Sequence, residues 1–234
     1  MVELGMDILD SLHRSISECA HLLPDLRRTV SRKFDQSAVT PADYLLDERI
    51  ATTLHAHLPG LQIVSEEKPL PEGSLEYGWV AIVDPLDGTE NFVSGIPIWG
   101  VSVSIWRDSQ HMGSLLSFPD LGMSLTSGDR PPKAGSRVSG FSASTSPLEI
   151  SQHPDGSNEF RVLGAATFNL FCVATGRLKS FHNLSGAYVW DIAAGINLAL
   201  EQGCAVKIDN RDYTGEFLAP SKRYRVEVFS PEPQ

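Results

Sequence analysis

Apolar residues recur at helical spacing near the start of the chain. The stripe consists of residues four apart along the sequence: Leu4, Ile8, Leu12 and Ile16. This spacing predicts an amphipathic helix over about residues 3–23. Because Pro24 has no amide hydrogen to donate, we expect it to kink or restart the helix.

A capping signal marks the start of a second helix. Thr40 can cap it, Pro41 suits the first helical position, and Asp43 falls at the reciprocal capping position. The helix is predicted to run to about His57, where Pro59–Gly60 ends it. Its buried face should contain Leu46, Ile50 and Leu54.

Shorter apolar runs predict strands, and two later periodic segments predict helices. The strands are expected at residues 62–65, 79–83, 101–106, 161–163, 205–208 and 223–229, and the helices at about 167–175 and 189–202. Residues 126–158 are rich in Ser, Gly and Pro, so we expect a loop or irregular edge there. Because helices and strands interleave without a strict βαβ rhythm, the pattern predicts a layered α/β sandwich with a mixed sheet.

The length of the chain limits its domain organisation. A chain of 234 residues can form one large α/β domain or two small ones. We expect a single domain over residues 1–234, with an N-terminal lobe at 1–125 and a C-terminal lobe at 160–234. The Ser/Gly/Pro-rich segment would form the seam between these lobes.

Composition narrows the partners and the compartment. The 19 basic and 29 acidic residues give a net charge of −10, which argues against general binding to nucleic acid or to an anionic membrane. A small phosphorylated substrate still fits, because a bound metal inverts the local field. There are 3 cysteines, no apolar run of membrane-spanning length and an acidic N-terminus, so we expect a cytoplasmic protein.

Carboxylates gather at the ends of predicted elements. Asp84 and Asp87 follow a buried strand, Glu66 follows the preceding one, and Asp191 opens a helix. If these groups converge, they form an all-oxygen site that suits Mg²⁺ or Mn²⁺ and not zinc. The backbone amides that follow, at Gly88 and Thr89, would then be available for phosphate oxygens.

Each acidic motif also has an ordinary structural explanation. Asp-Pro-Leu-Asp-Gly alone is typical of a turn, Glu66–Glu67 of a solvated pair, and Asp191 of a helix cap. We assign no histidine as a ligand, and for His182 a surface or substrate-rim position fits as well as a catalytic one. The order of the motifs along one chain favours the metal site.

Taken together, the motifs resemble those of the inositol monophosphatase family of metal-dependent, lithium-sensitive phosphatases. The family's Asp-Pro-x-Asp-Gly-Thr-x-Asn-Phe signature matches residues 84–92, and its Trp-Asp-x-Ala-Ala-Gly signature matches residues 190–195. The upstream glutamate matches Glu66, and an early pattern matches Lys33, Asp35, Val39, Thr40, Ala42 and Asp43. The similarity runs from about residue 5 to 208 and is weak only through 110–160. It implies the αβαβα sandwich of inositol monophosphatases and fructose-1,6-bisphosphatases.

The resemblance also implies a mechanism. One Mg²⁺ would be held by Glu66, Asp84 and the carbonyl of Leu86, and a second by Asp84, Asp87 and Asp191, with two or three ions per site. Glu66 and Thr89 would orient a metal-activated water for in-line attack on phosphorus. Two further residues, Asp43 and Lys33, would position Thr89 and the metal site.

Substrate contacts are implied at seven positions: Asp87, Gly88, Thr89, Gly164, Ala166, Asn183 and Asp191. Family members carry an acid shortly before the Trp-Asp pair, where it contacts inositol hydroxyls. Here Asn183 or Leu184 occupies that region. We therefore expect a phosphomonoesterase for a small phosphorylated metabolite, homodimeric like its relatives, with a weak preference for inositol 1-phosphate.

The sequence is also compatible with two alternative functions. The first is another substrate of the same superfamily, which would make the protein a 3′(2′),5′-bisphosphate nucleotidase or a fructose-1,6-bisphosphatase. The second is a regulatory or binding protein on the same fold whose hydrolysis is incidental. The complete set of acids argues against the second alternative, because buried carboxylates without a metal are costly.

Overall fold

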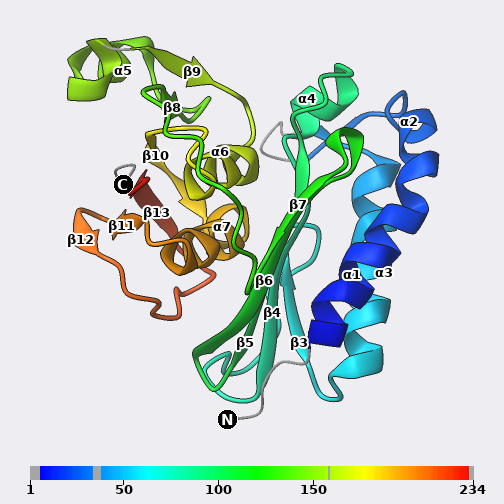
Figure 1. Ribbon diagram of the computed structural model, residues 1–234. Helices are drawn as coiled ribbons and strands as arrows, with labels where there is room; N and C mark the ends of the chain where they lie inside the picture. Colours follow the sequence, from blue (N-terminus) through cyan, green and yellow to red (C-terminus); the bar gives the residue numbers. More distant parts are fainter. Residues whose placement is uncertain (1–5, 34–37, 158, 232–234) are drawn as a thin grey trace.

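The protein is built from alternating layers of helices and sheets (Figure 1). The computed structural model describes residues 6–33, 38–157 and 159–231. Helices α1 and α3 cover one face of a first sheet, and α6 and α7 lie between that sheet and a second one. The short helix α5 lies on the far side of the second sheet, so the predicted layered α/β architecture is confirmed.

The N-terminal helices begin and end where the local sequence dictates. Helix α1 spans Met6–Cys19, a 3₁₀ turn follows at Ala20–Leu22, and α2 restarts at Leu23–Leu26 with Pro24 in its first turn. Leu4 and the predicted helix start lie outside the described residues. Two short strands, β1 (Ser31–Arg32) and β2 (Ala38–Val39), pair ahead of the next helix.

Helix α3 (Pro41–His57) has the predicted capping box. The Oγ1 atom of Thr40 accepts a hydrogen bond from the amide of Ala42 (3.2 Å), and Asp43 Oδ2 accepts one from the amide of Thr40 (2.8 Å). These contacts satisfy amides that the first turn leaves without helical partners. Leu46, Ile50 and Leu54 are buried as predicted.

The first sheet has the order β3-β4-β5-β6-β7. Strands β3 and β4 are parallel and the other neighbours are antiparallel. Its strands are β3 (Gln62–Ser65), β4 (Trp79–Asp87), β5 (Gly100–Arg107), β6 (Gln110–Phe118) and β7 (Met123–Thr126), with the 3₁₀ turn η2 (Pro119–Leu121) before the last. The pairing of β4 with β5 shifts between Asp84 and Asp87, and α4 (Thr89–Val93) follows directly.

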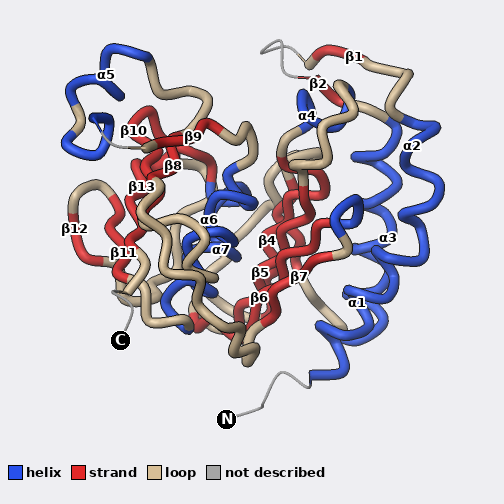
Figure 2. The backbone as a smooth tube through the Cα atoms, turned by 45° about the horizontal axis from the view of Figure 1, so that its top comes forward, coloured by secondary structure: helices blue, strands red, loops and turns tan. Residues whose placement is uncertain are grey.

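The second sheet has the order β12-β11-β13-β10-β8-β9 (Figure 2). Its strands are β8 (Ser139–Phe141), β9 (Phe160–Val162), β10 (Ser180–Tyr188), β11 (Ala205–Ile208), β12 (Arg211–Asp212) and β13 (Arg223–Phe229). The helical segments that follow β7 along the chain are α5 (Pro147–Gln152), η3 (Pro154–Ser157), α6 (Ala166–Ala174) and α7 (Val189–Glu201).

The prediction of an irregular segment over residues 126–158 is wrong in part. This segment contributes β8 to the second sheet and forms the capped helix α5. Phe141 is fully buried, and the hydroxyls of Ser139 and Ser180 hydrogen-bond to each other across the strands at 2.9 Å. A polar composition therefore does not exclude a buried strand when cross-strand partners satisfy its hydroxyls.

Helices α6 and α7 form the layer on which both sheets pack. Gly195 of α7 lies so close to Leu170 of α6 that a Cβ atom there would be 2.5 Å from Leu170 Cδ1. None of the helices in residues 6–33, 38–157 and 159–231 combines the length and the apolar character that a membrane span needs.

Candidate metal centre

Three of the predicted acids converge between the first sheet and α7. Glu66 follows β3, Asp84 lies in β4, and Asp191 lies in the first turn of α7. One carboxylate oxygen of each lies within 4.8 Å of the other two. This all-oxygen donor set is of the type that hard divalent cations such as Mg²⁺ prefer.

Backbone contacts place these carboxylates. The Glu66 amide donates to the carbonyl of Val83 (3.3 Å), which fixes the end of β3 against β4. Asp191 Oδ2 accepts a hydrogen bond from the amide of Tyr188 (2.9 Å). The Ser102 hydroxyl donates to the Trp190 carbonyl (3.1 Å) and so joins β5 to the start of α7.

Asp84 is the residue that a bound cation would satisfy most clearly. Its Oδ1 accepts a hydrogen bond from the Leu86 amide (3.0 Å), whereas its Oδ2 is buried and has no hydrogen-bond partner among the described residues. Burial raises the pKa of Asp84 well above its ordinary value, and the nearby charges of Glu66, Asp87 and Asp191 raise it further. A divalent cation would remove both costs, so the residues present fit a metal.

The neighbouring carboxylates are held in different ways. Burial also raises the pKa of Asp191, with Asp87 and Glu66 adding to the effect. Asp87 Oδ2 accepts hydrogen bonds from the amide and the hydroxyl of Thr167, both at 2.6 Å. Burial outweighs these contacts and raises the pKa of Asp87 to about 6. Thr167 was not singled out in the sequence, although it directly follows the Gly-Ala-Ala segment at the start of α6.

Lys33 connects to the metal centre through two glutamates. Its Nζ lies 2.8 Å from Glu66 Oε1 and 2.7 Å from Glu67 Oε1. Burial lowers the pKa of Lys33, but the two carboxylates outweigh it and the net shift is upward. The Glu67 side chain is only 3% exposed, and burial raises its pKa to about 7. Glu66–Glu67 is therefore not a solvated pair.

The predicted link between Asp43 and Thr89 is not made by a direct hydrogen bond. Asp43 is buried and accepts hydrogen bonds from both the amide and the hydroxyl of Thr40, the latter at 2.7 Å. The Thr89 hydroxyl donates instead to the Leu86 carbonyl (3.2 Å). Asp35, which belongs to the same early motif, lies outside the described residues.

A cavity of about 240 Å³ adjoins the metal centre. Its lining includes the predicted residues Asp87, Asp191, Gly164, Ala166 and Asn183. Leu184, the other residue considered for the position of the missing acid, lines a separate cavity.

Three polar side chains of the lining shape this cavity. Asn169 and Asn183 are each almost fully buried, and each has an Oδ1 atom without a hydrogen-bond partner among the described residues. Arg223 also lines the cavity and donates from Nη2 to the Gly186 carbonyl (2.6 Å). No local pattern marks Asn169 or Arg223 in the sequence, because tertiary packing alone brings them to the site.

The backbone conformation and close neighbours explain the glycines at positions 88 and 164. Gly88, the N-cap of α4, has φ of +88°, and a Cβ atom on it would lie 3.0 Å from the Cβ of Ala165. Gly164 has φ of +80°, and its Cβ would lie 2.8 Å from Asn91 Nδ2. Asn91 donates to the carbonyls of Ile98 (2.6 Å) and Leu163 (2.8 Å), which holds α4 against the segment that lines the cavity.

Comparisons with known proteins agree with this geometry. The model of the inositol monophosphatase family matches residues 20–129 and 133–228. An inositol-1-monophosphatase of Mesorhizobium japonicum is 30% identical over 226 residues, which cover 87% of this chain and 82% of the relative. The Nus factor SuhB of Pseudomonas aeruginosa is 31% identical over 219 residues, which cover 81% of this chain and 78% of the relative.

A solved structure shares the fold at lower sequence identity. It is an inositol monophosphatase/NADP phosphatase in complex with Mg²⁺ and phosphate, with a TM-score of 0.75 and 21% identity. The superposition covers 91% of this chain and 86% of that structure.

Proposed function

The chain belongs to the inositol monophosphatase family, and on that basis we propose that it is a metal-dependent phosphomonoesterase for a small phosphorylated metabolite. The observation that carries this proposal is the buried Asp84 Oδ2 atom, which lies in a cluster of carboxylates and has no hydrogen-bond partner among the residues that the structure describes. A folded protein tolerates such a group when a cation neutralises it.

The proposed cofactor is Mg²⁺, with Mn²⁺ as a substitute and two or three ions per site. The residues that would hold it are Glu66, Asp84, the Leu86 carbonyl, Asp87 and Asp191. When bound, the metal lowers the pKa of a coordinated water and neutralises charge on the phosphate and leaving oxygen. The family and the Mg²⁺ in a structure of the same fold support this choice.

The chain's own residues would orient the reactants. We assign Glu66 and Thr89 to hold the attacking water, and the amides of Gly88 and Thr89 to bind phosphate oxygens. The contact between Lys33 Nζ and Glu66 Oε1 (2.8 Å) would hold that carboxylate in position. Asp43 would act indirectly, because it accepts a hydrogen bond from the amide of Thr40, the residue that caps the start of α3.

The leaving group would occupy the cavity beside Asp87 and Asp191. The buried Oδ1 atoms of Asn169 and Asn183 can accept hydrogen bonds from substrate hydroxyl or amino groups. The Gly164 and Ala166 backbone lines the same space. Because Asn183 or Leu184 stands in the region where family members carry an acid, inositol 1-phosphate should be a poor substrate.

Arg223 favours a second candidate within the same reaction class. A guanidinium in the cavity wall suits a substrate with a second anionic group, such as a nucleoside 3′,5′-bisphosphate or a sugar bisphosphate. These substrates would make the enzyme a bisphosphate nucleotidase or a fructose-1,6-bisphosphatase.

A screen over phosphate esters with Mg²⁺, with and without Li⁺, tests the proposal. We expect Mg²⁺-dependent release of phosphate, inhibition by Li⁺, and a bisphosphate preferred over inositol 1-phosphate. Arg223→Ala should raise KM for the bisphosphate roughly tenfold and leave monophosphates nearly unchanged. Inositol 1-phosphate as the clearly preferred substrate would refute the substrate assignment. Absence of turnover on every ester would refute the enzyme assignment.

A regulatory role is the competing proposal of another class. One relative carries the name of a Nus factor and not of an enzyme. The two proposals differ in what Asp84→Asn does: it removes the function of a phosphatase, whereas a regulator that does not need hydrolysis retains its function.

The proposal also includes the domain organisation, the oligomeric state and the compartment of the protein. We propose that residues 1–125 and 160–234 act as lobes of one domain, that the protein is a homodimer, and that it is cytoplasmic. Light scattering of the purified chain tests the dimer, for which a monomeric mass would be the contrary result.

A further inference from the structure

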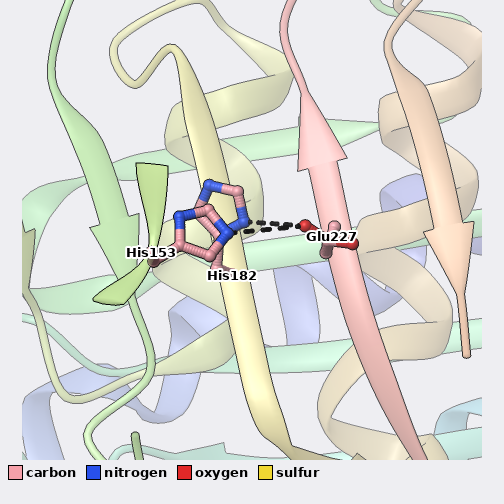
Figure 3. Close-up of side chains that lie close together, drawn as sticks. All are labelled: His153, His182 and Glu227. Atoms are coloured by element: carbon pink, nitrogen blue, oxygen red, sulfur yellow. Dashed lines mark hydrogen bonds and ion pairs between the residues drawn. The ribbon is translucent and has the colours of Figure 1, made fainter. Parts of the chain in front are cut away.

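The second sheet carries another group of metal-ligand side chains, on the face away from α6 and α7. These are His153, His182 and Glu227 (Figure 3). His182 of β10 and Glu227 of β13 are direct cross-strand partners, and His153 comes from the connection between α5 and η3. Because successive residues of a strand point to opposite faces, His182 lies opposite Asn183 and away from the cavity described above.

The three side chains are close enough to share one ion. One ligand atom of each lies within 4.8 Å of the other two. Glu227 Oε2 lies 3.2 Å from His182 Nδ1 and 3.8 Å from His153 Nε2, and the two ring centroids are 4.2 Å apart. In Figure 3 a nitrogen of each imidazole faces the Glu227 carboxylate.

The other nitrogen of the His182 ring already has hydrogen-bond partners. Its Nε2 lies 3.0 Å from Asp155 Oδ2 and 2.9 Å from the Ser180 hydroxyl. Asp155 is also paired with Lys179 at 3.2 Å. When Nε2 carries the ring proton it donates to the Asp155 carboxylate, and the Nδ1 lone pair is then directed at Glu227.

In this tautomer two acceptors face each other, and a cation between them stabilises the arrangement. A proton would serve, at the cost of a charged imidazolium in a fully buried position beside a second histidine. A metal ion would serve as well. The carboxylate–histidine–metal arrangement, in which one ring nitrogen donates to an acid and the other binds the ion, is a common motif of protein metal sites.

We propose that His153, His182 and Glu227 form a binding site for a divalent transition metal of the zinc type, separate from the all-oxygen centre. Two imidazole nitrogens and one carboxylate, with water in the fourth position, suit Zn²⁺ better than Mg²⁺. Glu227 also lines an open cavity of about 230 Å³, which gives an ion a route to the site.

Occupation of the site has structural consequences. When Nε2 of His153 binds the ion, its ring proton moves to Nδ1, so the 3.2 Å contact from the Asp155 amide to Nδ1 is lost. In exchange, the ion joins the α5–η3 connection to two strands of the second sheet. The expected role is therefore to stabilise this outer layer of the fold.

Equilibrium dialysis of the full-length, EDTA-treated protein against ZnCl₂ tests this site. Excess MgCl₂ keeps zinc from the all-oxygen centre, and bound zinc is counted by mass spectrometry. We expect about one zinc per chain and a zinc-dependent rise in Tm. His153→Gln and Glu227→Gln should each weaken zinc binding by more than about tenfold. His57→Gln, which changes an exposed histidine of α3, is the matched control and should bind like the wild type.

The contrary results are equally specific. Wild-type protein without bound zinc, or variants at His153 and Glu227 that bind zinc like the His57 control, would overturn the proposal. Asp84→Asn should retain its zinc, and loss of zinc from this variant would place the ion at the other centre. Circular dichroism verifies that each variant is folded. Where a variant is not folded, zinc binding is measured instead on Asp155→Asn, which removes the acid beside Nε2 of His182.

Discussion

Asp84 is where the electrostatic cost of the fold is concentrated. Its buried Oδ2 atom has no hydrogen-bond partner in the described part of the chain, and its pKa is raised by burial first and then by three other acids. The metal-free site is thus destabilised by repulsion that a divalent cation relieves. Asp87 differs because Thr167 supplies it with two hydrogen bonds.

The metal-free protein should become less stable as pH rises. Folding raises the pKa of Asp87 from 3.8 to about 6, and it raises that of Asp84 and Asp191 as well. At a pH between the two pKa values of Asp87, the folded chain binds more protons than the unfolded chain. The free energy of unfolding therefore falls as pH increases from about 4 to 6.

Urea unfolding in EDTA across this pH range measures the effect. Asp87→Asn should flatten the pH dependence, whereas the control Asp10→Asn, at an exposed position of α1, should not. Saturating Mg²⁺ should restore stability at the upper end of the range. Equal pH slopes for the two variants would contradict the account.

Thr89 is assigned to the attacking water and not to the metal. Thr89→Ala should therefore lower kcat by about tenfold to a hundredfold and leave Mg²⁺ affinity nearly unchanged. Thr89→Ser keeps the hydroxyl and should retain most of the activity. Steady-state kinetics with Mg²⁺ titrations separate the two effects, and an unchanged kcat in Thr89→Ala would remove the residue from the mechanism.

Among the elements, the pair α6–α7 depends on close contact between the two helices. Gly→Ala in a helix ordinarily increases stability by about 1 kcal/mol. Gly195→Ala should do the opposite and destabilise the protein by about 1–3 kcal/mol, because its Cβ would lie 2.5 Å from Leu170 Cδ1.

Chemical denaturation of Gly195→Ala provides the measurement. Adding Leu170→Ala to this variant should cost less than Leu170→Ala costs alone, since the smaller side chain removes the contacts with Cδ1 and Cγ and leaves only the contact with the Cβ of residue 170 at 2.6 Å. A single Gly195→Ala variant as stable as the wild type would show that the helices separate easily.

Elements with strong periodicity or local capping could be predicted from the sequence. Helix α3 is an example, because Thr40, Pro41 and Asp43 specify its start locally. Strands β6 and β8 could not be predicted, because their buried serines look like loop residues. Ser114 and Ser104 hydrogen-bond to each other at 3.1 Å across neighbouring strands, so their burial depends on tertiary pairing.

At the scale of the whole molecule, the proposed active site draws on every central layer. The first sheet provides Glu66 and Asp84, α7 provides Asp191, and the second sheet provides Asn183 and Arg223. The acids could be predicted because they lie in contiguous motifs. Arg223 could not, because only the packing of the second sheet against α6 and α7 brings it to the cavity.

The net charge of −10 bears on how an anionic substrate reaches this site. The overall field repels a phosphate ester, so attraction must be local and depend on the bound metal and on Arg223. This dependence makes the metal centre the decisive feature of the proposed function.

The most direct test of that centre is Mg²⁺-dependent phosphate release by Asp84→Asn, measured on the preferred ester of the screen. Asp10→Asn serves as the matched control. We expect normal turnover in the control and a loss of more than about a hundredfold in Asp84→Asn that excess Mg²⁺ does not restore. Substantial turnover by Asp84→Asn at saturating Mg²⁺ would contradict the central claim.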